Sequence, residues 1–147
     1  MTESIQIASQ APSGRSAHLP SSGRRIPVST YRLQLGPDLS FDQAAAQLDY
    51  LDDLGITDLY LSPILQAAPG STHGYDVVDY YAVEKDYGDQ PDFKRLIAEA
   101  HRRGIKVIID LVINHTGIEH PWFKASQEGD PEYRDWYIWE DNRPTFV

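Results

Sequence analysis

The sequence predicts an α/β fold built on a parallel β-sheet, and three observations support this prediction. Segments typical of strands and helices alternate in the order strand, helix, strand, helix, strand. Each predicted helix ends at a glycine, and the next predicted strand begins directly after it. The third predicted strand is an almost unbroken apolar run, which is typical of a strand buried on both faces. We therefore expect neighbouring parallel strands joined by right-handed crossovers.

The first strand and the first helix are predicted from their residue types. Residues 28–35 (VSTYRLQL) are rich in β-branched and aromatic side chains, which favour a strand. Ser40 and Gln43 form a capping-box pattern, so a helix is predicted to begin there. Apolar residues then recur at helical spacing until Gly55, which lacks the Cβ that a left-handed helix end disfavours.

The same unit then recurs. Residues 56–61 (ITDLYL) are the second predicted strand, and Pro91 suits the first position of a second helix. Gly104 ends that helix, and residues 105–112 (IKVIIDLV) form the third predicted strand. The connection from each helix to the following strand is very short.

Two segments are too long for ordinary connections and are predicted to carry function. Residues 63–90 follow the second strand and residues 113–147 follow the third, so both leave the carboxyl ends of parallel strands, where such folds place their sites. Their composition is not that of disordered chain. The first segment holds Tyr75, Tyr80, Tyr81 and Tyr87, and the second holds Trp122, Trp136 and Trp139.

Composition narrows the class of ligand. The chain has 147 residues with 13 basic and 22 acidic side chains, which gives a formal net charge of −9. This balance disfavours nucleic acid or an anionic membrane as a partner, and it is compatible with a neutral ligand such as a sugar. Without cysteine, the chain has no disulfide, no thiol nucleophile and no cysteine-based metal site.

The first 26 residues are predicted to be a flexible leader. They carry Ser, Pro, Gly and Ala without periodicity and lack the apolar stretch of a secretory signal, which favours a cytoplasmic location. No apolar run is long enough for a membrane span.

One polar run lies at the end of the third predicted strand. Asp110 and Asn114 would share one face of the extended chain, with His115 just beyond. A carboxylate, an amide and an imidazole can bind sugar hydroxyls, and the oxygens can bind a hard cation. Equally, Asp110 and Asn114 could do no more than satisfy backbone groups where the strand ends.

A second run, Gly70-Ser-Thr-His-Gly-Tyr-Asp, lies in the segment after the second strand. Its glycines permit sharp turns that could present Tyr75 and Asp76 to a ligand. A tyrosine ring offers an apolar face to a pyranose and a hydroxyl beside it. The alternative is a packed loop in which Tyr75 belongs to the core.

Aromatic residues cluster in 119–123 (EHPWF) and 133–139 (YRDWYIW). Such clusters suit carbohydrate clefts, but they also suit the core of a small subdomain, and we expect most of these rings to be structural. The histidines show no helical metal-ligand pair, and the sequence contains no glycine-rich phosphate loop and no nucleophile-elbow motif.

Together these motifs resemble the α-amylase family of glycoside hydrolases (family 13). Asp110 to His115 is similar to the DxxxNH motif at the end of that family's third barrel strand. The Gly74-Tyr-Asp and Asp79-Tyr-Tyr runs are similar to its segment after strand two. The resemblance implies a fold class of α/β type, a partial TIM (β/α)₈ barrel. Residues 27–116 would supply strands 1 to 3 with two helices, and residues 117–147 would begin the subdomain inserted after strand 3.

The resemblance also implies roles for individual residues. Tyr75 would stack on the glucose next to the bond being broken, and His115 would hydrogen-bond that glucose. Asp110 and Asp76 would be supporting polar residues of the substrate site. Asn114 corresponds to a residue that binds a structural calcium ion in many members; no other cofactor is implied.

The implied partner is an α-linked glucose oligosaccharide, and two branches of the family share the resemblance. Residues 29–34, 60–63 and 68–76 resemble maltooligosyl trehalose synthase, which rearranges the reducing-end bond of a maltodextrin. Residues 92–96 and 112–123 look more like α-glucosidases, amylases and trehalose synthase. The family's nucleophile and acid/base would lie beyond Val147, so no catalytic residue is expected in this chain. The alternative of another class is a non-catalytic α/β sugar-binding module.

Overall fold

The computed structural model describes residues 25–139, which form a three-stranded sheet, a two-stranded sheet and the helices around them. In chain order the elements are β1 (Thr30–Leu33), α1 (Phe41–Ala45), α2 (Leu48–Asp53), β2 (Asp58–Leu61), β3 (Leu65–Ala67), β4 (Val77–Val83), the 3₁₀ helix η1 (Lys85–Tyr87), α3 (Gln90–Arg102), β5 (Lys106–Ile109), α4 (Pro121–Gln127) and the 3₁₀ helix η2 (Arg134–Trp136).

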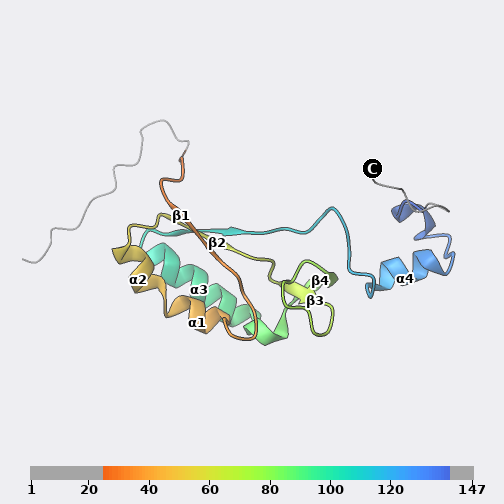
Figure 1. The fold of residues 1–147 in the computed structure, drawn as a ribbon, viewed down its shortest axis with the longest axis horizontal. Helices are drawn as coiled ribbons and strands as arrows, with labels where there is room; N and C mark the ends of the chain where they lie inside the picture. Colours follow the sequence, from red (N-terminus) through yellow and green to blue (C-terminus); the bar gives the residue numbers. More distant parts are fainter. Residues whose placement is uncertain (1–24, 140–147) are drawn as a thin grey trace, which may run out of the picture.

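The main sheet has the strand order β1-β2-β5, and both of its pairings are parallel. Arg32 of β1 is level with Tyr60 of β2, which is level with Ile108 of β5. Figure 1 shows α1, α2 and α3 together on one side of these strands. The predicted alternation and the parallel sheet are confirmed, although each strand is four residues long and shorter than predicted.

The first predicted helix is interrupted. The capping box is present, because the backbone N–H of Gln43 donates to the Ser40 hydroxyl and the Ser40 N–H donates to the Gln43 side chain. The prediction of one continuous helix was wrong: a turn separates α1 from α2, where the N–H of Gln47 bonds the carbonyl of Ala44, three residues back instead of four. The apolar face nevertheless continues across the turn. Gly55 ends α2 with a φ of 82°, as its position predicted.

Helix α3 begins and ends where its signals indicate. Asp89 caps it by accepting from the N–H of Asp92, whose side chain accepts from the Asp89 N–H in return. Pro91 lies in the first turn, where its missing N–H costs no helical hydrogen bond. Gly104 follows with a φ of 78° and leads directly into β5.

The core lies between the three helices and the main sheet. Leu59 and Leu61 of β2 are fully buried on the helix-facing side, against Phe41 of α1 and Leu96 of α3. The remaining buried members of this cluster are Leu35, Ala44, Leu48, Leu51, Ile64, Tyr87, Ala100 and Ile105.

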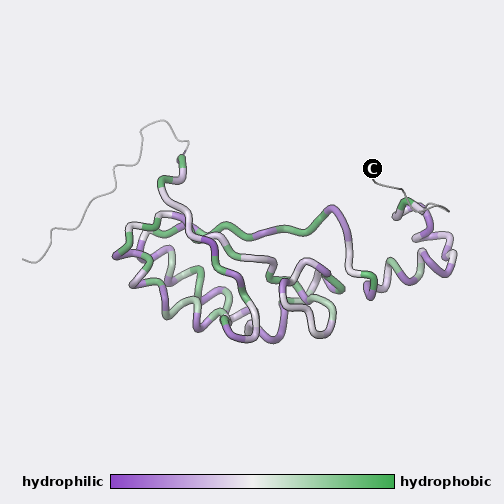
Figure 2. Tube along the Cα trace, in the orientation of Figure 1, coloured by the Kyte–Doolittle hydropathy of each residue, from purple (hydrophilic) through white to green (hydrophobic). Residues whose placement is uncertain are grey.

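The prediction that the third strand is buried on both faces was wrong for the described residues. Ile108 and Ile109 of β5 are 40% and 39% exposed, and Leu111 beyond the strand is 62% exposed. Figure 2 shows this hydrophobic run on an extended segment. Within residues 25–139, β5 is at the edge of the sheet and the helices cover one face, so apolar composition alone does not produce burial.

As its length had suggested, the segment 63–90 is more than a plain connection. It contains an antiparallel pair, β3 and β4, in which Leu65 is level with Val83 and Ala67 with Val77. The register shifts on both sides of Gln66, so the pair is irregular. This hairpin projects beyond the carboxyl end of β2 and carries the Gly-rich run between its strands.

Most of the predicted leader, residues 1–24, lies outside the described residues. Arg25, which the leader prediction included, is part of the fold. Its guanidinium donates to both carboxylate oxygens of Asp58 and, at 2.8 Å, to the Thr57 carbonyl. Asp58 is 1% exposed, and this pairing offsets the cost of burying its charge.

Asp58 should make stability depend on pH in acid. Its hydrogen bond with Arg25 lowers the pKa of Asp58 below its ordinary value of 3.8. The stabilisation is therefore present above this ordinary pKa and is lost as the pH falls through the lower pKa of the folded state. In thermal melts across the acid range, Asp58→Asn should flatten the dependence of Tm on pH. An equally steep dependence in the variant would assign it to other carboxylates.

No helix within residues 25–139 combines the length and the apolar character that a membrane crossing requires.

Candidate functional site

Two of the predicted polar side chains meet at the carboxyl end of the main sheet. Asp110 is the first residue after β5, and Tyr75 comes from the connection between β3 and β4. The Tyr75 hydroxyl donates to the Asp110 carboxylate, although the two residues are far apart in the sequence. Both side chains are half-buried, so each keeps a surface open to a ligand.

The segment after β5 brings His115 to the same place. Its Nε2 lies 3.1 Å from the backbone carbonyl oxygen of Tyr75. The hydroxyl of Tyr80, on β4, lies 3.0 Å from the carbonyl oxygens of both Val112 and His115. The structure therefore brings Tyr75, Asp110 and His115 together at this end of the sheet.

Close backbone contact holds the two loops together. The N–H of Gly117 donates to the Val77 carbonyl at 2.8 Å, and its Cα faces the carbonyl of Asp76. A Cβ at position 117 would lie 2.7 Å from that oxygen, so glycine is the residue that permits the approach.

Asp76 does not join this convergence through its side chain. Its carboxylate accepts from the Ser71 hydroxyl and lies 3.8 Å from Nδ1 of His73, so it is turned into its own loop. Its backbone carbonyl accepts from the N–H of Ala68, which closes the loop at its base. In this geometry Asp76 shapes the loop that presents Tyr75.

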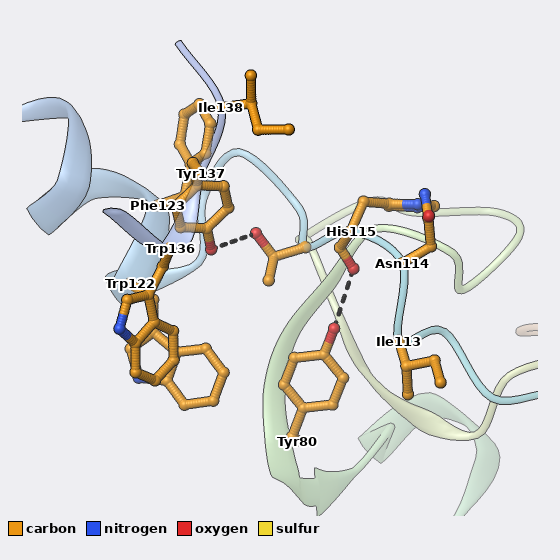
Figure 3. A pocket seen from close by; sticks show the side chains of 10 residues that line it. Tyr80, Ile113, Asn114, His115, Trp122, Phe123, Trp136, Tyr137 and Ile138 are labelled. Carbon is orange, nitrogen blue, oxygen red and sulfur yellow. Dashed lines mark hydrogen bonds between the residues drawn. The ribbon is translucent and has the colours of Figure 1, made fainter. Parts of the chain in front are cut away.

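Asn114, together with His115, lines a cavity of about 700 Å³. Figure 3 shows Ile113, Asn114 and His115 on one wall of this cavity and the aromatic rings of α4 and η2 on the other. The full lining is Tyr80, Ile113, Asn114, His115, Thr116, Trp122, Phe123, Trp136, Tyr137 and Ile138.

The oxygen ligands around Asn114 do not by themselves make a calcium site. Calcium takes six to eight oxygen ligands, and no group of three or more His, Cys, Asp or Glu side chains that could hold a metal occurs within residues 25–139. Asn114 would supply one amide oxygen. The calcium assignment therefore stays a prediction.

The predicted aromatic cluster forms the opposite wall. Trp122 stacks on Tyr80 at 5.8 Å between centroids and lies 4.4 Å from the ring of His120. His120 is buried and caps α4, and burial lowers its pKa. The hydroxyls of Thr116 and Tyr137, which both line the cavity, are hydrogen-bonded at 2.8 Å. These contacts join β4, the segment after β5 and the chain beyond it.

Two residues of the convergence were not predicted. Arg32 donates to the Tyr75 hydroxyl at 3.2 Å, and its guanidinium lies 5.7 Å from the ring centroid of Tyr60. A hydrogen bond with Asp110 raises the pKa of the Tyr60 phenol. Alternation along residues 28–35 could have indicated Arg32, because Arg32 and Gln34 are polar residues two positions apart at the carboxyl end of a strand.

The arrangement suits a polyhydroxylated ligand. The carboxylate of Asp110 accepts hydrogen bonds, and the phenol of Tyr60 donates or accepts them. Because Nε2 of His115 donates to the Tyr75 carbonyl, its Nδ1 remains as an acceptor. The Tyr75 ring beside them has an apolar face. Sugar rings present the same combination of hydroxyls and an apolar C–H surface.

Comparisons with known proteins agree on one family. The family described as "Alpha amylase, catalytic domain" matches residues 42–146. A 4-alpha-glucanotransferase of Thermotoga neapolitana is 45% identical over 96 residues, which are 65% of this chain and 21% of that protein.

Two solved structures are similar in fold and in sequence. The trehalose-6-phosphate hydrolase of Bacillus licheniformis has a TM-score of 0.67 and 41% identity, over 79% of this chain and 22% of that one. The maltooligosyltrehalose synthase of Arthrobacter ramosus has a TM-score of 0.70 and 39% identity, over 76% of this chain and 16% of that one. The predicted start of a (β/α)₈ barrel is thereby confirmed, and the chain spans about a fifth of the length of the curated relatives it matches.

Proposed function

The chain belongs to the α-amylase catalytic-domain family, and from this premise we propose that it forms part of an enzyme that acts on α-glucosidic bonds of maltodextrins or related glucans. The observation that carries the proposal is the meeting of Tyr75, Asp110 and His115 at the carboxyl ends of parallel strands. In (β/α)₈ barrels this end holds the active site.

The three residues have complementary parts in the proposed site. The ring of Tyr75 stacks against the apolar face of the glucose unit beside the bond that reacts. The Nε2–H of His115 donates to the Tyr75 carbonyl, so its Nδ1 accepts a hydrogen bond from a hydroxyl of that glucose, and Asp110 accepts one while it holds the Tyr75 phenol. Together they bind and orient one glucose unit.

We assign the chemical step to neither Asp110 nor Asp76. A retaining glycosidase uses two carboxyl groups about 5 Å apart, one as nucleophile and one as acid/base. Asp110 accepts from Tyr75, and Asp76 accepts from Ser71 within its own loop. With neither residue as nucleophile or acid/base, we expect the 147 residues by themselves to be inactive on glucans.

Within the family we favour maltooligosyl trehalose synthase activity. This reaction moves the reducing-end glucose from an α-1,4 bond to an α,α-1,1 bond within the same molecule. Support comes from the runs 29–34 and 68–76, which supply Arg32 and Tyr75, and from the similar fold of the Arthrobacter ramosus enzyme.

Hydrolysis is the second candidate. The helix start at residues 120–123 and the run 92–96 resemble the glucosidase branch, and the similar trehalose-6-phosphate hydrolase is named for hydrolysis.

Product analysis distinguishes these reactions. The enzyme that contains this chain is incubated with maltohexaose, and the reducing ends and the linkages are followed by NMR and by a reducing-sugar assay. The proposed synthase removes reducing ends and forms an α,α-1,1 linkage without net hydrolysis. A rise in reducing ends would favour the hydrolase. No conversion of any α-glucan would contradict the proposed function, and turnover by the 147-residue chain alone would contradict its expected inactivity.

A further inference from the structure

Arg32 lies beside the proposed glucose site, and the proposed function gives it no role. It is the third residue of β1, and its partners across the main sheet are Tyr60 and Ile108. Level residues of neighbouring strands project to the same face of a sheet. The guanidinium therefore lies over the ring of Tyr60, 5.7 Å from its centroid.

The hydrogen bonds of Arg32 lead to the site. One nitrogen, Nη2, donates to the side-chain oxygen of Gln34 at 2.9 Å and to the Tyr75 hydroxyl at 3.2 Å. The same hydroxyl donates to the Asp110 carboxylate. The phenol oxygen of Tyr75 is thus held between a cation on β1 and an anion directly after β5.

A phenol held in this way has one orientation. A tyrosine ring turns about two side-chain bonds, and its backbone alone does not fix where the hydroxyl end lies. Here Arg32 and Asp110 fix that end from β1 and from the end of β5, while Gln34 donates to the carbonyl of His73 beside it, at 3.3 Å. The hydroxyl end is therefore placed before a ligand arrives. Because a phenol O–H and its acceptor direction lie near the ring plane, the two hydrogen bonds also favour one orientation of the ring that a glucose unit would meet.

We propose that Arg32 is a positioning residue, which holds the Tyr75 ring in its stacking orientation by donating to the Tyr75 hydroxyl. The inference rests on the proposed function, because a fixed ring serves the binding of a glucose unit. Arg32 acts on the substrate only through Tyr75. Arginine suits this place, since its planar guanidinium can cover an aromatic ring and donate from its edge at once.

The electrostatics agree with a permanent cation at this position. The hydrogen bond to Tyr75 raises the pKa of Arg32 above its ordinary value, so the guanidinium stays charged. The guanidinium also interacts electrostatically with Asp110 and offsets part of the negative charge of that carboxylate. Loss of Arg32 would leave Asp110 as the remaining anchor of the Tyr75 hydroxyl.

A double-mutant cycle in the enzyme that contains this chain tests the proposal. Arg32→Gln should lower kcat/KM for maltooligosaccharides roughly tenfold, because a loosely held ring spends less time in the productive orientation. In a Tyr75→Phe background, which lacks the hydroxyl, the same change should cost little further activity. Arg32→Lys, which keeps the charge without the planar donors, should give the same pattern with a smaller loss.

A second measurement needs no activity. In enzyme labelled with fluorotyrosine, the fluorine resonance that is missing from Tyr75→Phe reports the Tyr75 ring. Arg32→Gln and Arg32→Lys should shift or broaden this resonance. The matched control is Arg95→Gln, which removes an exposed guanidinium paired with Asp42 and Asp92 on the helices, and it should change neither the resonance nor kcat/KM.

The outcomes separate the two proposals. If the enzyme converts no α-glucan, the proposed function fails, and the fluorine spectra still decide whether Arg32 orients Tyr75. An unchanged Tyr75 resonance in both Arg32 variants overturns the inference. An equal loss of kcat/KM with and without the Tyr75 hydroxyl also overturns it, because Arg32 would then act on the substrate directly.

Discussion

Asp110→Ala should lower kcat/KM of the enzyme that contains this chain roughly 100-fold, since one residue would remove several contacts at once. The Tyr75 hydroxyl would lose its acceptor, and the guanidinium of Arg32 would lose the carboxylate that offsets it. The hydrogen bond proposed from Asp110 to a glucose hydroxyl would also be lost. Steady-state kinetics with maltooligosaccharides of defined length measure the effect.

Asp110→Asn is the matched control for this prediction. The amide keeps the size of the side chain and one oxygen that accepts from Tyr75, but it lacks the charge, so its loss should be smaller. Because Asp110 follows β5 and is half-buried, Tm should change little in either variant. A normal kcat/KM in Asp110→Ala would show that this carboxylate does not belong to the site.

Gly117→Ala should lower the free energy of unfolding by about 2–3 kcal/mol, the cost of forcing an extra carbon into a filled space. The new Cβ would lie 2.7 Å from the carbonyl oxygen of Asp76 and 3.2 Å from that of Val77. These neighbours are backbone atoms of the loop that carries Tyr75, so they cannot turn away as a side chain can. Chemical denaturation of the enzyme measures the loss.

Gly36→Ala is the matched control, because no atom lies within 4 Å of a Cβ built there. It should leave stability nearly unchanged. Gly117→Ala should also reduce activity, since moving the segment after β5 carries His115 away from Tyr75. Equal stabilities for the two variants would show that the two loops do not touch in solution.

The order of elements could be predicted because its signals are local. The capping box at Ser40 and the glycines Gly55 and Gly104 act through neighbouring residues, and all three behave as their positions indicated. The break between α1 and α2 has no comparable signal, because Ala46 and Gln47 both favour helix.

The features that the sequence did not predict depend on distant partners. Residues 77–83 are rich in Val and Tyr and could be a strand by composition, but pairing them with the short β3 requires the irregular register around Gln66. The prediction that β5 is buried on both faces was wrong for the same kind of reason. Ile108 and Ile109 show a buried composition, and what covers a strand is set by other parts of a protein.

The site was predicted in part. Tyr75, Asp110 and His115 belong to motifs, and the structure brings them together. The direction of the Asp76 side chain, towards Ser71, depends on the turn of a single loop and is not encoded by the motif. The alternation in residues 28–35 could indicate the face on which Arg32 lies, but its contact with Tyr75 spans 43 positions, and a strand pattern does not specify that partner.

A crystal structure of the enzyme with a bound maltooligosaccharide would show whether Tyr75, Asp110 and His115 bind one glucose unit. One glucose ring should lie against the face of Tyr75, with hydroxyl groups within hydrogen-bonding distance of Asp110 and His115. A sugar that occupies another part of the protein, with these three side chains facing only solvent, would contradict this prediction.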